Sequence, residues 1–324
     1  MADLWRLLTR WYISSLLLAG VGVLIGYAIF FHLLSGQPKI GYIDVPFTVI
    51  DADSAWFIGQ MLDFAEREDS IKAIVISLDS PGGFAAESEK LFLKTAKLRE
   101  KKPVVIVSQG VNASGGYLWS VGANYIYAMP SSIVGSVGAL GGLPRPRQLD
   151  EDLISTGPAK LGGTRRTSAG QLETLKESFL NIVFSQRGDK LKLTPLELSR
   201  AQVYLGMEAL RLGLVDAIGT DSDGVKKAAS LAGISSYDVV DVNVEVLRNI
   251  FQKIARIQEP LNVEVNEGSG VDSQFKIPDL MTQLKVVRDV LPTLGGNDGD
   301  VGLPIRPEDL DIPRLFYLYV PPAE

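Results

Sequence analysis

The stretch IKAIVISLDSPGG, residues 71–83, indicates the fold class of this chain of 324 residues. Its first part, Ile71–Leu78, is a short and nearly continuous apolar run, as expected of a strand that is buried on both faces. Ser80-Pro81-Gly82-Gly83 then breaks the strand, and a helix is predicted over about residues 85–100. A buried strand that leads through a glycine turn into a helix is the repeating unit of a parallel sheet.

The same alternation of strand and helix continues on both sides of this stretch. Before it, Ile40–Val45 is predicted to be a strand, and a helix capped by Ser54 is expected to follow. Further strands are expected over three ranges, 103–108, 125–129 and 134–140. A glycine-rich turn around Ser114 opens a short helix, and the alternation ends near Val242. We therefore predict an α/β fold with a largely parallel sheet.

Composition divides the chain into four regions. They are a cytoplasmic tail (residues 1–10), a transmembrane anchor (11–37), an α/β domain (38–242) and a C-terminal α+β extension (243–324). The extension is set apart by linkers rich in glycine, aspartate, asparagine and proline between its predicted helices and strand.

An uncharged run from Trp11 to Gln37 predicts a single membrane span. Its apolar part, Ile13–Leu34, is longer than the roughly 20 residues that a bilayer-spanning helix needs and than the about 7–15 residues of a signal peptide. Arg6 and Arg10 precede the run and only Lys39 closely follows it, so the N-terminus is expected in the cytoplasm. Membrane lipid is thus an expected partner, and the α/β domain is expected on the extracytoplasmic side of the cell membrane.

The residue inventory excludes several chemistries. The chain has no cysteine, which excludes thiol catalysis, disulfides and cysteine-bound zinc. Its single histidine, His32, lies in or beside the apolar run, which excludes a Ser-His-Asp triad within the α/β domain. The net charge of −6 gives no basic footprint for nucleic acid. No metal or cofactor is predicted, and a serine nucleophile in this chain would need a lysine base.

Three glycine-rich segments, each following a predicted strand, carry groups suited to that chemistry. Asp79–Gly83 can present backbone N–H groups to an oxyanion. Asn112–Tyr117 holds Ser114 at a helix N-terminus, where the dipole favours developing negative charge. Gly135–Gly138 is the third segment. A lysine base must lose its proton near pH 7, which takes about 4–5 kcal/mol of desolvation and neighbouring effects.

In this order, the motifs resemble those of the signal peptide peptidase A family. That family has an SPGG loop, a nucleophile in ASGGY, a GS-x-G turn and a lysine soon after a glycine. The corresponding segments here are Ser80–Gly83, Ala113–Tyr117, Gly135–Gly138 and Gly157–Lys160, within a resemblance that covers about residues 40–220.

The resemblance implies a set of site residues. They are the nucleophile Ser114, the general base Lys160, the oxyanion donors Gly82 or Gly83 with Gly115, and Ser136 as the residue that orients the lysine amine. The segment after Lys160, residues 161–166, lacks the proline-aromatic continuation of the family. Lys190 and Lys192 are therefore alternative bases, although they lie in a charged stretch that favours their protonated form.

The resemblance also implies a fold and a function. The implied fold is the Clp protease/crotonase-like spiral of β-β-α units. The resemblance also implies that residues 38–242 are a serine peptidase domain. The function is that of a membrane-anchored serine endopeptidase acting on remnant signal peptides or other membrane-proximal peptides. Members of the family form homo-oligomeric rings, in which the dyad can be shared between subunits.

Two alternatives to this function stay open at the level of sequence. A crotonase-like acyl-thioester enzyme uses the same oxyanion geometry without needing Ser114 and Lys160 together. A catalytically silent membrane scaffold would keep only the protease fold. The apolar tail Leu315–Val320 also has two possible placements, on a sheet edge near the active-site groove or against a domain where it holds an oligomer together.

Overall fold

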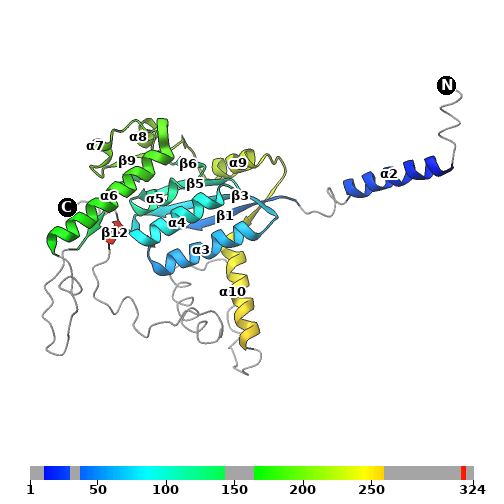
Figure 1. The fold of residues 1–324 in the computed structure, drawn as a ribbon, viewed down its shortest axis with the longest axis horizontal. Helices are drawn as coiled ribbons and strands as arrows, with labels where there is room; N and C mark the ends of the chain where they lie inside the picture. The colour runs from blue at the N-terminus through cyan, green and yellow to red at the C-terminus, as the bar shows by residue number, and fades with distance from the viewer. Residues whose placement is uncertain (1–10, 30–36, 143–163, 259–314, 319–324) are drawn as a thin grey trace.

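A central sheet of eight strands organises the computed structural model, which describes residues 11–29, 37–142, 164–258 and 315–318 (Figure 1). Its main strand order is β10-β6-β5-β3-β1-β11. In addition, β7 pairs with β5, and β9 pairs with β7. All of its pairs are parallel except β7 with β9. The strands are β1 (Lys39–Val45), β3 (Ile71–Ser80), β5 (Val104–Ala113), β6 (Tyr125–Ala128), β7 (Ile133–Gly135), β9 (Val203–Leu205), β10 (Ala217–Ile218) and β11 (Asp238–Asp241). The predicted α/β fold with a largely parallel sheet is confirmed.

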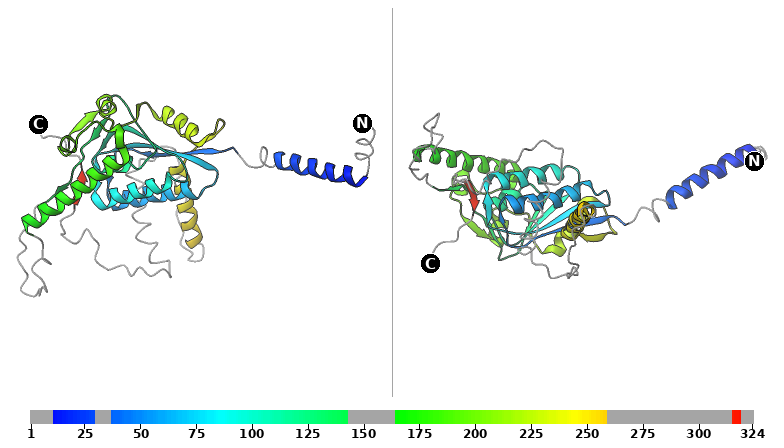
Figure 2. Two further views of the ribbon diagram at one scale, coloured as in Figure 1. Left: turned by 45° about the horizontal axis from the view of Figure 1, so that its top comes forward. Right: turned by 90° about the horizontal axis from the view of Figure 1, so that it is seen from below.

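A second, smaller sheet has the order β2-β4-β12-β8. Its strands are β2 (Val49–Ile50), β4 (Gly82–Phe84), β12 (Leu315–Leu318) and β8 (Leu140–Gly141). The strand β12 is far from the others in sequence, and Figures 1 and 2 show it in red at the end of the domain opposite α2.

Helices cover both faces of the large sheet (Figure 2). The helices of the described residues are α2 (Trp11–Ile29), α3 (Ala52–Arg67), α4 (Ala85–Leu98), α5 (Gly115–Ser120), α6 (Arg165–Arg187), α7 (Pro195–Leu198), α8 (Gly206–Arg211), α9 (Asp221–Ala232) and α10 (Val242–Gln258), with a 3₁₀ turn at Gly188–Lys190. The helices α3 and α4 pack together, and α9 packs on β3 and β5.

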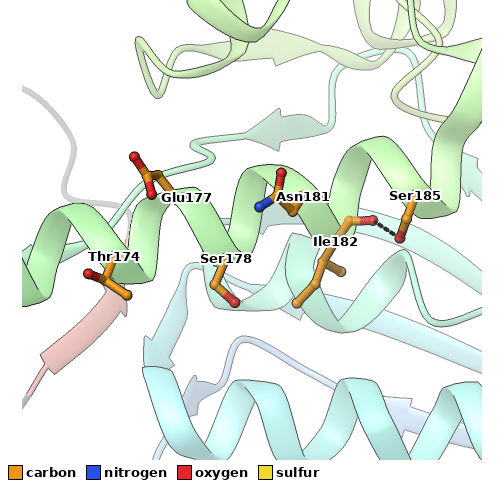
Figure 3. Close-up of a pocket in the computed structure, with 6 residues that line it drawn as sticks. All are labelled: Thr174, Glu177, Ser178, Asn181, Ile182 and Ser185. Carbon is orange, nitrogen blue, oxygen red and sulfur yellow. Dashed lines mark hydrogen bonds between the residues drawn. The ribbon is translucent and has the colours of Figure 1, made fainter.

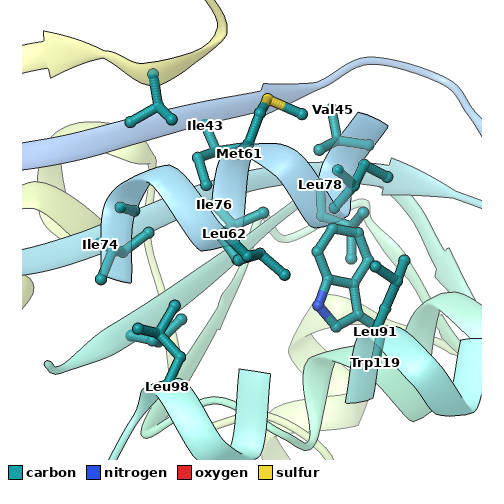
Figure 4. Close-up of a cluster of buried hydrophobic side chains, with 14 of the residues drawn as sticks. Ile43, Val45, Met61, Leu62, Ile74, Ile76, Leu78, Leu91, Leu98 and Trp119 are labelled. Carbon is teal, nitrogen blue, oxygen red and sulfur yellow. The ribbon is translucent and has the colours of Figure 1, made fainter. Parts of the chain in front are cut away.

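The two faces of β3 explain its apolar sequence. Ile74 and Ile76 point into the cluster beneath α3 and α4, where they meet Met61 (Figure 4). Ala73 and Val75 belong to the cluster on the other face, which α9 covers. These four side chains of β3 are fully buried, as predicted for a strand with helices on both sides.

The helix that was predicted to be capped by Ser54 starts earlier, at Ala52, with Asp51 as its N-cap. The Asp51 carboxylate accepts a hydrogen bond from the Ser54 N–H at 2.8 Å, and the Ser54 hydroxyl accepts one from the Asp51 N–H at 2.8 Å. Such reciprocal capping satisfies two backbone donors that a helix N-terminus leaves without partners.

The predicted domain boundary at residue 242 falls at the first residue of α10. Val242 and Val246 are buried in the same cluster as Ile43 of β1, and α10 contacts both α3 and β1. The first part of the predicted C-terminal extension therefore packs on the α/β domain.

The helix α2 extends away from the domain (Figures 1 and 2). Its side chains Leu16, Leu18 and Val23 are each more than 70% exposed. Within the described residues, however, no helix combines the length and the apolar character needed to cross a membrane. The transmembrane helix predicted over residues 11–37 is thus not found among the described residues. Of that segment, α2 covers 19 residues, and residues 30–36 lie outside the described part.

Candidate active site

Ser114 occupies a strained turn between the end of β5 and the start of α5. Its φ of 53° and ψ of −120° lie in a region that residues with a side chain rarely adopt, at a cost of about 1–3 kcal/mol. The Ser114 N–H donates to the Gly135 carbonyl at 2.7 Å, and its carbonyl accepts from the Leu118 N–H at 2.9 Å. The residue is buried, and its hydroxyl makes no hydrogen bond to another described residue.

A buried polar network lies directly behind this turn. The Asn112 side chain donates to the Ser108 hydroxyl at 2.6 Å and accepts from the Ser120 hydroxyl at 3.0 Å. All three residues are fully buried. Because the network joins β5 to the last residue of α5, it fixes the two elements between which Ser114 lies.

The SPGG loop is held by its own serine. The Ser80 hydroxyl donates to the Thr48 carbonyl at 2.7 Å and accepts from the Gly82 N–H at 3.1 Å. At Gly83 a Cβ atom would lie 1.9 Å from the Ile50 carbonyl oxygen, so only glycine fits against β2. Since the Gly82 N–H is already engaged, Gly83 is the better candidate oxyanion donor of the predicted pair.

The nucleophile turn and the SPGG loop lie side by side. At Gly116 a Cβ atom would lie 2.9 Å from the Ser80 carbonyl oxygen, and Ser80 is in register with Asn112. Two segments that are about thirty residues apart in sequence thus meet through their backbones, and β4, which begins with Gly82 and Gly83, contacts α5, which begins right after Ser114.

The GS-x-G turn joins the same site. Gly135 has a φ of 124° and is in register with Ala113, next to the nucleophile turn. Ser136 has a φ of 54°, is largely buried and donates its N–H to the Gln202 carbonyl at 2.8 Å. The prediction of one continuous strand over residues 134–140 is wrong. The left-handed backbone at Ser136 interrupts it, and the structure has two short strands, β7 and β8, in its place.

The predicted base Lys160 lies outside the described residues. The two alternative lysines do not have the buried environment that such a base needs. The Lys190 ammonium is bound to the Asp216 carboxylate at 2.8 Å with 60% of its side chain exposed, and Lys192 is exposed.

Sequence reasoning missed a charged cluster beyond α5. The Arg187 guanidinium donates two hydrogen bonds of 3.0 Å to the Asp216 carboxylate and one of 2.8 Å to the Gly213 carbonyl. The Tyr117 hydroxyl donates to the neighbouring Leu214 carbonyl at 2.8 Å, and burial raises the pKa of Tyr117 so that it stays a donor. The only sequence signal was the motif Leu212–Gly219, in which Asp216 occurs without an evident partner.

A shallow depression along α6 is separate from this constellation (Figure 3). Its lining residues are Thr174, Glu177, Ser178, Asn181, Ile182 and Ser185. The Ser185 and Thr174 hydroxyls donate to carbonyls of their own helix, and the depression holds no lysine. Its lining therefore does not offer a serine paired with a lysine.

A serine in a strained strand-to-helix turn, with glycine backbone packed against it, defines a candidate serine hydrolase. Comparisons with known proteins narrow this class. Residues 96–151, which include Ser114, match the family model described as Peptidase family S49.

Two relatives whose curated names are those of proteases agree with this match. A putative protease of Methanocaldococcus jannaschii is 33% identical over 214 residues, which cover 61% of this chain and 68% of the relative. Protease 4 of Salmonella typhi is 34% identical over 189 residues, which cover 53% of this chain but only 30% of the relative. A solved mutant of the 1510-N membrane-bound stomatin-specific protease aligns with 60% of this chain and 86% of its own, at 16% identity and a TM-score of 0.42.

The chain belongs to peptidase family S49, the serine peptidases that include signal peptide peptidase A. The resemblance predicted from the four motifs is confirmed. The chain spans about two thirds of the length of the archaeal relative and less than one third of Protease 4.

Proposed function

We propose that this protein is a membrane-anchored endopeptidase that cuts remnant signal peptides or other membrane-proximal peptides with a Ser114–Lys160 dyad. The observation that carries the proposal is the strained, backbone-held turn of Ser114 next to the SPGG loop. The Clp protease/crotonase-like spiral remains the proposed superfamily fold, with residues 38–242 as its peptidase domain.

In the proposed first step, the neutral Lys160 amine takes the proton of the Ser114 hydroxyl as its oxygen attacks the scissile carbonyl carbon. The carbonyl oxygen becomes negatively charged and accepts hydrogen bonds from the N–H groups of Gly83 and Gly115. Collapse of this intermediate breaks the C–N bond, and the Lys160 ammonium protonates the leaving amine. Water then hydrolyses the acyl-enzyme by the same route in reverse. Ser136 is the proposed hydroxyl that orients the lysine amine.

Backbone positions support this assignment of the oxyanion site. Donors that are fixed before the reaction stabilise developing charge without reorganisation, and each such donor is worth about 10²–10³ in kcat. The Gly83 backbone is fixed because it packs against Ile50 without room for a Cβ atom, and Gly115 directly follows the held backbone of Ser114.

Membrane anchoring and assembly are further parts of the proposal. The uncharged run from Trp11 to Gln37 and the exposed apolar side chains of α2 support attachment to the cell membrane, with the N-terminus in the cytoplasm and the peptidase domain outside. A homo-oligomeric ring would allow Lys160 of one subunit to serve Ser114 of the next. Co-expression of Ser114→Ala and Lys160→Ala subunits tests this, because activity appears only if the dyad is shared.

Comparison of four full-length variants in detergent tests the dyad. Ser114→Ala, Lys160→Ala and Lys160→Arg should each lose casein cleavage by about 10³-fold or more, the arginine variant because its side chain stays protonated. Lys192→Ala is the matched control and should retain activity. A fluorophosphonate probe should label Ser114 in the wild type, which neither an acyl-thioester enzyme nor a silent scaffold predicts. Substantial activity in Lys160→Arg would remove Lys160 from the role of base.

A further inference from the structure

The strand β12 of the C-terminal tail lies in the second sheet between β4, which begins with Gly82 and Gly83, and β8. It pairs antiparallel with β4, with Phe316 opposite Phe84, Tyr317 opposite Gly83 and Leu318 opposite Gly82. On its other side it pairs antiparallel with β8, where Phe316 is opposite Leu140. The tail strand thus lies near the candidate site, as one of its two predicted placements has it, but between two strands and not on a sheet edge.

Removal of β12 from the order β2-β4-β12-β8 would leave a slot. Within the described residues, β8 pairs with β12 alone, and β4 pairs otherwise only with β2. The facing edges of β4 and β8 would then be two strand spacings apart, roughly 9–10 Å. Such a gap fits one extended chain, which would form main-chain hydrogen bonds on both of its sides.

The slot runs past the proposed catalytic groups. Its β4 wall begins with Gly82 and Gly83 of the SPGG loop, and its β8 wall follows the turn of Ser136. The strand β12 also contacts α5, whose first residue follows Ser114. A peptide in this slot would therefore pass the nucleophile and the oxyanion donors together.

We propose that the slot between β4 and β8 binds extended peptide substrates and that the chain's own residues 315–318 occupy it as an autoinhibitory strand. The inference rests on the proposed function of this same site. A tethered competitor has a high effective concentration, so that substrate reaches only the fraction of molecules with an open slot. The sequence suits this role, because the residue types of 315–320 favour extended backbone and the two prolines that follow have no N–H groups to donate to a strand pairing.

An engineered disulfide tests the occupancy in the full-length chain, which has no cysteine of its own. Phe84→Cys combined with Phe316→Cys places two thiols on directly opposite residues of an antiparallel pair, at a Cα separation of about 4.5–5.5 Å that a disulfide spans. Oxidation should give an intramolecular cross-link and lower casein cleavage and fluorophosphonate labelling of Ser114 by about tenfold or more, and dithiothreitol should reverse both. A cross-linked enzyme as active as its reduced form would overturn the proposal, as would failure of the cross-link to form.

Release of the strand should have the opposite effect. Tyr317→Pro removes a main-chain donor inside β12 and should lower KM and speed labelling of Ser114, whereas the matched control Tyr317→Phe keeps the backbone and should behave as wild type. A synthetic peptide of residues 313–320 should then inhibit Tyr317→Pro competitively.

The outcomes separate the two hypotheses. Equal labelling of Ser114 in the locked, reduced and released enzymes would refute autoinhibition and leave the peptidase function standing. No labelling of Ser114 in any of them would refute the proposed function itself. Dissociation of an oligomer with loss of activity in Tyr317→Pro would assign β12 a structural role and overturn the inhibitory one.

Discussion

Two buried polar clusters flank the short helix α5, and they differ in chemistry. The neutral network consists of Ser108, Asn112 and Ser120 and lies behind the turn of Ser114. The charged lock consists of Arg187 and Asp216 and lies where the Tyr117 hydroxyl meets the loop after α8. No buried side-chain nitrogen or oxygen atom of the described residues lacks a hydrogen-bond partner. The neutral network ties α5 to the preceding strand β5, whereas the Tyr117 hydroxyl ties α5 to Leu214, which is 97 positions away and lies beside the charged lock.

The difference between the clusters suggests a division of labour. Neutral hydrogen bonds hold the nucleophile turn in its strained backbone without placing a charge beside the reaction. A buried ion pair is a weaker source of net stability than its geometry suggests, but breaking it is costly because one charge is left without its partner. We therefore expect damage to the neutral network to appear mainly in catalysis and damage to the charged lock mainly in stability.

The largest effect is expected when the charged lock is broken. Arg187→Ala leaves the Asp216 side chain, which is only 4% exposed, without its bidentate partner, and should lower the free energy of unfolding by about 3 kcal/mol. Urea unfolding of the full-length protein in detergent measures this. Lys190→Ala is the control: its side chain is 60% exposed, so its loss should cost less than about 1 kcal/mol. Equal losses in the two variants would contradict the lock.

Damage to the neutral network should give the next largest effect. Asn112→Ala removes both hydrogen bonds of the network, the one to Ser108 within β5 and the one to Ser120 of α5, and should displace Ser114, with a loss in kcat on the order of 10²-fold. Casein turnover per folded molecule is the measurement, and Ser120→Ala, which removes only one of the two bonds, should lose less. A kcat unchanged in Asn112→Ala would show that the turn holds its shape without the network.

Local motifs made much of the site predictable from sequence. The SPGG loop, the turn of Ser114 and the turn of Ser136 each follow a predicted strand, and parallel strands bring their ends to one edge of a sheet. The helix cap was missed by a few residues, since Asp51 and Ser54 are both good capping residues and only the reciprocal hydrogen bonds distinguish them.

Pairing between distant residues was beyond the sequence. Arg187 and Asp216 are 29 positions apart, and no spacing rule links a helix C-terminus to a loop beyond the next two helices. The apolar tail was recognisable as a strand, but its partners Gly83 and Leu140 were not, because sheet register depends on the whole fold.

Acid should affect the charged lock more weakly than its mutation does. Burial alone would raise the pKa of Asp216, but hydrogen bonds and charge from Arg187, with Lys190, outweigh it and hold that pKa below its usual range. The stabilisation is therefore complete above the unfolded value near 3.9 and is lost as the pH falls through the lower folded value. Urea unfolding between pH 7 and pH 3 should give a falling free energy for wild type and a flatter profile for Asp216→Asn.

The smallest expected effect concerns the neutral network under the same change of pH. Ser108, Asn112 and Ser120 have no group that titrates between pH 3 and pH 7, so their hydrogen bonds should contribute equally throughout this range. The difference in unfolding free energy between wild type and Asn112→Ala should thus stay constant within about 0.5 kcal/mol, while both curves fall together because the charged lock is intact in each. A difference in unfolding free energy that shrinks towards pH 3 would mean that the two clusters are coupled through α5. The proposal that one cluster serves catalysis and the other stability would then be wrong.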